Sequence, residues 1–257
     1  MEAMTHKQRV LNAIQRKSVG RHPVQLDFSP AALDKMFTYL NIPRLGEEAL
    51  LEFTDNHIVY GFLNDPFGKI RKRQIESGKE LFDDWGVGWD TNQEGTFFSY
   101  HPLADMDNYK NYKFPDPYAP ELMDFAKEAA QKYGQEYLVS SYQVVGLFER
   151  AWALRGFENF MVDMMIDEDF AETLLDKIME YQMIVAGRYI EAGVECGRTG
   201  DDYGGQDGML MSPDLWRKLV KPRLKRIWDV YKDAGLPVIH HSCGDVRPII
   251  PDFIEMG

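Results

Sequence analysis

The sequence predicts an α/β protein with parallel strands. Short apolar runs, typical of strands, alternate with longer segments of helical periodicity along the 257 residues. Five steps from strand to helix can be followed in this way, with no internal repeat and no low-complexity linker between them. We therefore expect one domain over residues 1–257, built on one parallel sheet.

The first predicted element is a short amphipathic helix. Thr5 and Gln8 have the spacing of a capping box, and Val10, Leu11 and Ile14 follow on one face. This pattern marks the start of a helix and not a signal peptide.

A strand–helix unit comes next. Residues 23–28 are predicted as a strand, Ser29 as the N-cap and Pro30 as the first residue of a helix. A second strand is predicted over 57–63. Residues 64–118 are rich in Gly, Pro, Asp and aromatic residues without a sustained period, which predicts a long irregular excursion with short strands. Such segments usually form lids or binding loops.

The second half repeats the alternation more regularly. Strands are predicted over 137–142, 194–199 and 236–241. Helices are predicted over 120–133, 148–154 and 167–192, from Pro213 to Gly235 with a break at Pro222, and over 246–256.

The last residue, Gly257, is of the type found between a helix and the next strand. Five parallel strands do not close an eight-stranded barrel, so a barrel would lack roughly a third of its elements in this chain. We favour such a truncated barrel, lacking its C-terminal strands. The alternative is an open five-stranded sheet that is complete in itself.

Composition excludes several classes of protein. The chain is 44% apolar and 27% charged, as in globular proteins. The formal net charge of −12 argues against nucleic-acid binding, which needs clustered basic side chains. Cys196 and Cys243 are the only cysteines, so we expect no disulfide framework and a cytoplasmic location. No apolar run reaches the roughly 18 residues of a membrane helix.

The sharpest site motif is His241-Ser242-Cys243 at the end of the last predicted strand. Parallel α/β proteins place their working groups at such strand ends. Imidazole and thiolate are preferred Zn²⁺ ligands, and this spacing lets both turn toward one point. Two ligands do not complete a zinc site. The alternative is a buried thiol beside a hydrogen-bonded histidine, and spacing alone does not decide between them.

Asp201 and Asp202 follow the preceding strand in a glycine-rich segment. Adjacent carboxylates can orient a cation, accept a proton or hold a substrate ammonium group. They are equally typical of an ordinary turn. We favour a functional role because this loop would neighbour the His-Cys loop in a parallel sheet.

Asp27, Gln143 and Glu149 lie at or after predicted strand ends and are candidate substrate contacts. Such groups more often cap the next helix, and Glu149-Arg150 fits a plain surface pair equally well. The chain has no Gly-x-Gly-x-x-Gly after a strand, no P-loop, no Gly-x-Ser-x-Gly and no His-Glu-x-x-His motif. These absences argue against nucleotide-cofactor enzymes and serine hydrolases.

Several motifs together resemble the uroporphyrinogen decarboxylase superfamily, over nearly the whole chain. They are Gln8–Ile14 with Arg21–Val24, Gly146–Trp152, Gly200–Gly204 with Leu210–Pro213 and Lys221–Lys225, and His241–Gly244. Their order and spacing carry the resemblance more than any single motif. It implies a TIM-type (β/α)8 barrel of roughly 340 residues, in agreement with truncation after about five βα units.

The resemblance allows two chemistries. Decarboxylases of the superfamily carry an Arg-x-x-Gly-Arg motif that grips substrate carboxylates. The matching segment here, Val24–Ser29, has no arginine and places Asp27 there, a charge of the wrong sign. This favours the corrinoid-dependent methyltransferases, of the methylcobalamin:coenzyme M type.

That branch implies Zn²⁺ bound by His241, Cys243 and a further cysteine, which would fall beyond Gly257. Methylcobalamin or another corrinoid would arrive on a separate carrier protein. The other substrate would be a small thiol, a folate, or a methoxy or methylamine compound. The oligomeric state, a homo-oligomer included, is left open.

Under this interpretation Asp201 and Asp202 orient the acceptor or an outer histidine, while Gln143 and Tyr203 contact the substrate. One alternative is a decarboxylase in which Asp201 stabilises pyrrole N–H groups without a metal. Another is a non-catalytic barrel that binds a corrinoid or a protein partner.

Overall fold

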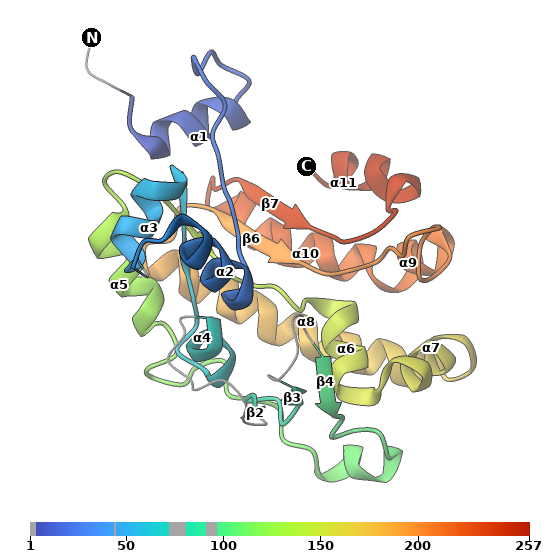
Figure 1. Cartoon of the computed structure of the whole chain (residues 1–257). Coiled ribbons are helices and arrows are strands. Elements are labelled where there is room, and N and C mark those ends of the chain that lie inside the picture. Colours follow the sequence, from blue (N-terminus) through green and yellow to red (C-terminus); the bar gives the residue numbers. More distant parts are fainter. Residues whose placement is uncertain (1–3, 44, 72–80, 91–96) are drawn as a thin grey trace.

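Parallel strands form the centre of the computed structural model (Figure 1), which describes residues 4–43, 45–71, 81–90 and 97–257. The described parallel strands are β1 (Ile58–Gly61), β5 (Leu138–Ser141), β6 (Gly197–Gly200) and β7 (Val238–His241). β1 pairs with β5, and β6 pairs with β7. Isolated parallel bridges join β5 to β6, so the order is β1-β5-β6-β7 and the carboxyl ends share one edge.

Helices pack against one face of these strands. α5 (Asp124–Tyr133) lies on β1 and β5, and α10 (Lys221–Asp233) lies on β7 and along α8 (Glu168–Glu191). The main apolar core fills the space between strands and helices. The remaining α-helices are α1 (His6–Ile14), α2 (Pro30–Leu40), α3 (Glu47–Thr54), α4 (Pro66–Arg71), α6 (Leu147–Arg155), α7 (Phe157–Ile166), α9 (Pro213–Leu219) and α11 (Ile250–Met256), with 3-10 turns at Met106–Asn111 and Arg247–Ile249.

The opposite, inner face of the strands carries a second, smaller apolar cluster. Leu138 and Cys196 are fully buried there, with Ile58 and Ile239 packed beside them. Val10 of α1 completes the cluster, so α1 covers the inner face near the amino ends of the strands. This arrangement follows from strand geometry, because alternate side chains point to opposite faces.

Helix boundaries follow local chemistry closely. Thr5 and Gln8 form the expected capping box at the start of α1. Ser29 caps α2, whose first residue is Pro30, and Asp167 caps α8. The helical segment that contains Pro222 is split as expected, into α9 and α10. None of the helices in the described part of the chain is long and apolar enough to cross a membrane.

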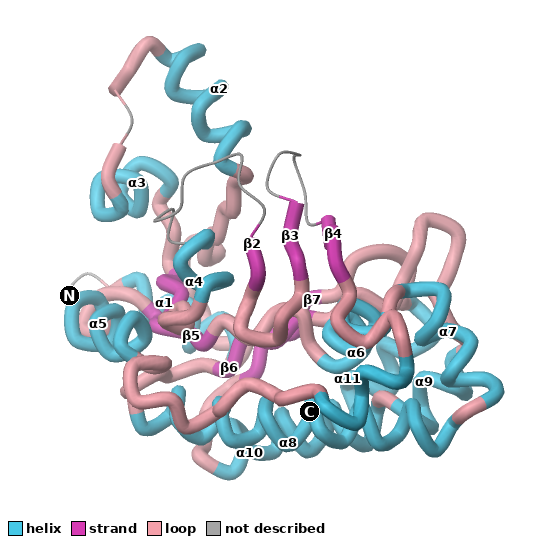
Figure 2. Tube along the Cα trace, turned by 90° about the horizontal axis from the view of Figure 1, so that it is seen from below, coloured by secondary structure: helices cyan, strands magenta, loops and turns pink. Residues whose placement is uncertain are grey.

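The excursion over residues 64–118 holds a separate antiparallel sheet (Figure 2). Its strands are β2 (Leu81–Phe82), β3 (Gly88–Asp90) and β4 (Phe97–Tyr100). The expectation of short strands is thus confirmed, although 72–80 and 91–96 lie outside the described residues.

Asp83 organises the connection from β2 to β3. Its carboxylate accepts the backbone N–H groups of Trp85 and Val87, each over 3.0 Å, and the Trp89 indole N–H over 3.1 Å. Arg150 of α6 donates to the same carboxylate over 2.6 Å, and both side chains are buried. The small sheet is therefore tied to the helix that follows β5.

The strand expected over residues 23–28 is not formed, so this prediction is wrong. One backbone hydrogen bond links the segment to the start of β1, from the His57 N–H to the Val24 carbonyl over 2.9 Å, and two side-chain amides provide the other links. Asn56 accepts the Leu26 N–H over 2.7 Å and donates to the Leu26 carbonyl over 3.0 Å, while Gln25 accepts the Ile58 N–H over 3.1 Å. The parallel α/β class is confirmed, but with one strand fewer than expected. The described strands form no closed sheet.

Candidate functional site at the strand ends

The loops after β6 and β7 meet at the carboxyl edge of the sheet. Gly200 and His241 are paired at the last register position of the two strands, and Asp201 donates its N–H to the His241 carbonyl over 3.0 Å. Asp202 and Cys243 follow directly. The strand pairing therefore brings together residues that are about 40 positions apart in the sequence.

Asp202, His241 and Cys243 form a group that can hold a metal ion, with one ligand atom from each within 4.8 Å of the others. His241 Nε2 lies 3.3 Å from Cys243 Sγ and 3.5 Å from Asp202 Oδ1. Asp202 Oδ1 also accepts the Cys243 N–H over 2.7 Å. His241 and Cys243 are exposed, so a substrate can reach them from solvent. The neighbouring loop thus places a carboxylate oxygen of Asp202 beside the predicted His-Cys pair.

Two glycines allow these loops to touch. A Cβ on Gly204 would lie 2.6 Å from the Asp245 nitrogen, and one on Gly244 would lie 2.2 Å from the Gly204 carbonyl carbon. Gly244 also has φ of +77°, a conformation that L side chains rarely adopt. Any side chain at Gly204 or Gly244 would push the two loops apart.

Gly244→Ala is accordingly expected to lower the free energy of unfolding by about 2 kcal/mol or more, because a left-handed backbone and a clash act together. Gly235→Ala is the matched control, since Gly235 has φ of +76° with open space around its Cβ position. Its expected cost is only about 1 kcal/mol. Equal midpoints of urea unfolding for the two variants would contradict the loop contact.

Further acidic groups lie beside Asp202, His241 and Cys243. Burial and the adjacent Asp201 and Asp202 carboxylates raise the pKa of Glu149 to about 9. Glu149 Oε2 accepts the Asp202 N–H over 3.2 Å. Burial and the Asp202 contact raise the pKa of the Cys243 thiol to about 11. A bound cation would lower both pKa values, because it stabilises the charged forms.

Asp201, unlike the adjacent Asp202, is buried away from the group of possible metal ligands. It is 1% exposed, and its two carboxylate oxygens accept the N–H groups of Phe148 and Glu149 over 2.8 and 2.7 Å. These N–H groups belong to the first turn of α6, so Asp201 caps that helix from another loop. Burial raises the pKa of Asp201 to about 6, against the effect of these hydrogen bonds. Asp201 therefore positions Glu149 beside the candidate group of Asp202, His241 and Cys243.

Gln143 and Tyr203 do not join this group. The Gln143 amide donates to the Gln182 side chain over 2.7 Å and accepts from the Tyr231 hydroxyl, so it faces α8 and α10. Tyr203 is fully buried, and its ring packs against Trp216. Both side chains lie on the helix-covered side of the strands.

Asp27 lies on the inner side of the sheet, in a group that the sequence analysis did not find. It accepts the Tyr60 hydroxyl over 2.8 Å and lies 3.6 Å from the Arg198 guanidinium. That guanidinium stacks over the rings of Tyr60 and Tyr142, 4.4 and 4.8 Å from their centroids. Arg198 sits two residues before Gly200 and thus about 7 Å below the His241 level of the sheet. In the sequence, the signal for this group is a charged residue, Arg198, inside a short predicted strand.

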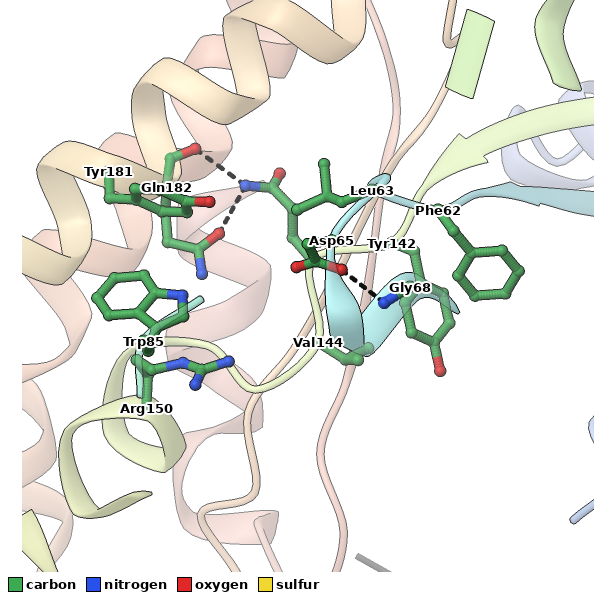
Figure 3. A pocket seen from close by; sticks show the side chains of 11 residues that line it. Phe62, Leu63, Asp65, Gly68, Trp85, Tyr142, Val144, Arg150, Tyr181 and Gln182 are labelled. Carbon is green, nitrogen blue, oxygen red and sulfur yellow. Dashed lines mark hydrogen bonds between the residues drawn. The ribbon is translucent and has the colours of Figure 1, made fainter. Parts of the chain in front are cut away.

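A small polar cavity lies near β1 and α8 (Figure 3). Asp65, Trp85, Arg150 and Gln182 are among its lining residues, and Asp65 accepts the Gly68 N–H over 2.5 Å. Its volume of about 30 Å³ has room for ordered water only. Substrates must therefore bind elsewhere.

Asp65 makes the stability of the folded protein depend on pH, because burial raises the pKa of its carboxyl group to about 6. The folded state keeps a proton that the unfolded chain, with a carboxyl pKa of about 3.9, has already lost. The associated stability is present below pH 4 and is lost as the pH rises through 6. Asp65→Asn is expected to match the wild-type Tm at pH 4 and to exceed it by several degrees at pH 7.5. Parallel Tm curves across this range would contradict the assignment.

Comparison with known proteins identifies the family of this chain. Residues 84–257 match the family described as Uroporphyrinogen decarboxylase (URO-D). The chain is 23% identical over 253 residues to methylcobamide:CoM methyltransferase MtbA of Methanosarcina mazei, and 22% identical to that of Methanosarcina acetivorans. Each alignment covers 95% of this chain and 72% of the relative. Uroporphyrinogen decarboxylase of Thermus thermophilus is 31% identical over 90 residues, which cover 34% of this chain and 25% of that protein.

A solved structure extends the likeness to the fold. The structure of a methyltransferase from Methanosarcina mazei superposes with a TM-score of 0.61 at 20% sequence identity. The superposition covers 99% of this chain and 74% of the other. The arrangement of strands and helices is therefore shared over almost the whole length of this chain.

Proposed function

Because this chain belongs to the uroporphyrinogen decarboxylase (URO-D) family, on its methyltransferase branch, we propose that it moves a methyl group between a corrinoid and a small acceptor. The acceptor or donor opposite the corrinoid is a thiol, a folate, or a methoxy or methylamine compound. The corrinoid would be presented by a separate carrier protein. Of these acceptors, a small thiol fits the site best.

The observation that carries the proposal is the convergence of Asp202, His241 and Cys243 at the open strand ends. An imidazole, a thiolate and a carboxylate make a donor set that suits Zn²⁺ and leaves a position for a substrate. The raised pKa values of Cys243 and Glu149 support the same conclusion, since a bound cation would offset the burial and the negative charge that raise them. Bound there, Zn²⁺ would supply Lewis acidity that makes a thiol acidic near neutral pH.

The protein's own residues would prepare this transfer. Asp202 holds the Cys243 backbone and so fixes the loop that carries the thiolate ligand. Glu149 stands next to Asp202, and a cation bound there would lower its pKa from about 9, so that its carboxylate could take a proton from an acceptor thiol or from water. Arg198 offers a positive charge, on the inner face, to an anionic end of the acceptor.

The reaction itself is a simple displacement. The acceptor thiol would lose its proton to the Glu149 carboxylate or to water, and its sulfur would form a bond to the methyl carbon. The bond between that carbon and cobalt would break, with its electron pair left on the corrinoid. Placing the two reactants in line at an open mouth is the main task of the protein.

The test uses the full chain with methylcobalamin and a series of small thiols, with and without added Zn²⁺. We expect zinc-dependent formation of the methyl thioether, together with loss of the methylcobalamin absorption band. Release of CO₂ from uroporphyrinogen, insensitive to chelators, would instead favour the decarboxylase alternative. Binding of a corrinoid protein without transfer to any acceptor would favour a non-catalytic role.

A further inference from the structure

A second group of potential metal ligands lies at the other end of the strands. His6 belongs to α1, while Asp55 and His57 lie between α3 and the first residue of β1. One ligand atom from each of the three lies within 4.8 Å of the others. The group at the carboxyl ends, Asp202 with His241 and Cys243, is separated from it by the length of the strands.

His6 is oriented like a metal-bound histidine. Its Nδ1 lies 2.5 Å from Glu136 Oε1, and its backbone N–H donates to the same oxygen over 3.1 Å. Its Nε2 is then directed to Asp55 Oδ1, 3.5 Å away. A carboxylate on one ring nitrogen commonly fixes the tautomer of a ligand histidine and frees the other nitrogen for the metal.

His57 shows the same division of roles. It is fully buried, and its Nδ1 lies 2.7 Å from the Asp55 carbonyl oxygen, which places the proton on Nδ1. The Val24 N–H also points at Nδ1, over 3.3 Å, and would need it as an acceptor, but the much shorter contact with the Asp55 carbonyl favours the proton on Nδ1. Nε2 is left as a bare acceptor, and it has no hydrogen-bond partner in the described part of the chain. Buried acceptors without a partner are rare, because they forfeit their hydration.

Asp55 is also held in place. Arg21 donates to both of its carboxylate oxygens, over 2.8 Å to Oδ1. A ligand carboxylate that accepts hydrogen bonds from its surroundings is typical of metal sites, and each oxygen keeps a further lone pair. The side chains of His6 and Asp55 are 28% and 35% exposed, so an ion can enter from solvent.

We propose that His6, Asp55 and His57 form a second metal site, which takes a divalent transition ion such as Zn²⁺. Two imidazoles and one carboxylate are a donor set that these ions favour, and solvent can complete the coordination. The ion fastens α1 to the segment that leads into β1. Because Val10 of α1 covers the inner face of the sheet, the ion stabilises the closed amino end of the fold. This site is independent of the proposed methyl transfer.

The test isolates this site from the one at the strand ends. The untagged full chain carrying His241→Ala and Cys243→Ser is dialysed against Zn²⁺ alone, and bound metal is counted. We expect one ion per chain and a rise in Tm of roughly 5 °C at saturating zinc. Adding His6→Gln should weaken zinc binding by at least about tenfold and remove most of the rise in Tm. His6→Gln is preferred to a change at His57, since His6 is part-exposed and its loss disturbs the fold less.

His22→Gln is the matched control, because His22 is an exposed histidine outside the group. It should leave both zinc stoichiometry and Tm unchanged. Absence of zinc binding by the double variant would overturn the proposal, as would equal binding with and without His6→Gln. In the second case the ion would belong to other surface groups. Neither result depends on whether the wild-type chain transfers methyl groups.

Discussion

Cys243→Ser is expected to lower the rate of methyl transfer from methylcobalamin to a thiol by about 10²-fold or more. Serine is close in size, but its hydroxyl does not ionise to serve as a soft metal ligand. Cys243 is exposed, so the Tm should change by no more than about 2 °C. Initial rates at fixed zinc, with Tm measured on the same samples, check this expectation.

Cys196→Ala provides the control for this experiment. Cys196 is buried in the apolar cluster under α1, where burial raises the pKa of its thiol to about 12. Its loss should reduce stability and leave most of the rate. A Cys243→Ser variant that keeps more than about a tenth of the wild-type rate would contradict the role of the thiolate.

Asp83→Ala is expected to cost about 3–5 kcal/mol of unfolding free energy, because it leaves Arg150 as an unpaired buried charge. Three further donors, from Trp85, Val87 and Trp89, lose their acceptor at the same time. Urea unfolding measures the loss as a lower midpoint with an unchanged slope.

Asp214→Ala is the surface comparison for Asp83→Ala. Asp214 also pairs with an arginine, Arg217, but its side chain is 94% exposed. Exposed pairs of this kind contribute little, so we expect a change below about 0.5 kcal/mol. A similarly small change for Asp83→Ala would show that Arg150 finds other partners in its polar cavity.

The sequence predicted several helix starts correctly, although it did not predict the helices α3 and α7. Caps at Thr5, Ser29 and Asp167 are local interactions, and each is present in the structure. The segment 23–28 has an apolar pattern typical of a strand, yet its partner at Asn56 is a side chain instead of a backbone. A strand forms only where another segment supplies its hydrogen bonds. Tertiary contacts decide which segment that is, and the hydrophobic pattern of the sequence does not contain this information.

The candidate site shows the same limit. The predicted pair His241 and Cys243 does lie together, because both follow one strand at a fixed spacing. The face of the sheet on which the Gln143 side chain lies depends on the register of the strand. A shift of one residue moves a side chain to the other face. Its amide lies against α8 instead of the strand-end mouth. The further cysteine ligand expected beyond Gly257 stays a prediction, and Asp202 is a candidate oxygen ligand within the chain.

The most direct test of the metal centre is X-ray absorption at the zinc edge. The measurement uses the His6→Gln variant loaded with one equivalent of Zn²⁺, so that the ion occupies the strand-end group. We expect one sulfur neighbour at about 2.3 Å, from Cys243, with nitrogen and oxygen neighbours at about 2.0–2.2 Å. A first shell of nitrogen and oxygen alone would show that Cys243 does not bind the ion, and would contradict the proposed centre.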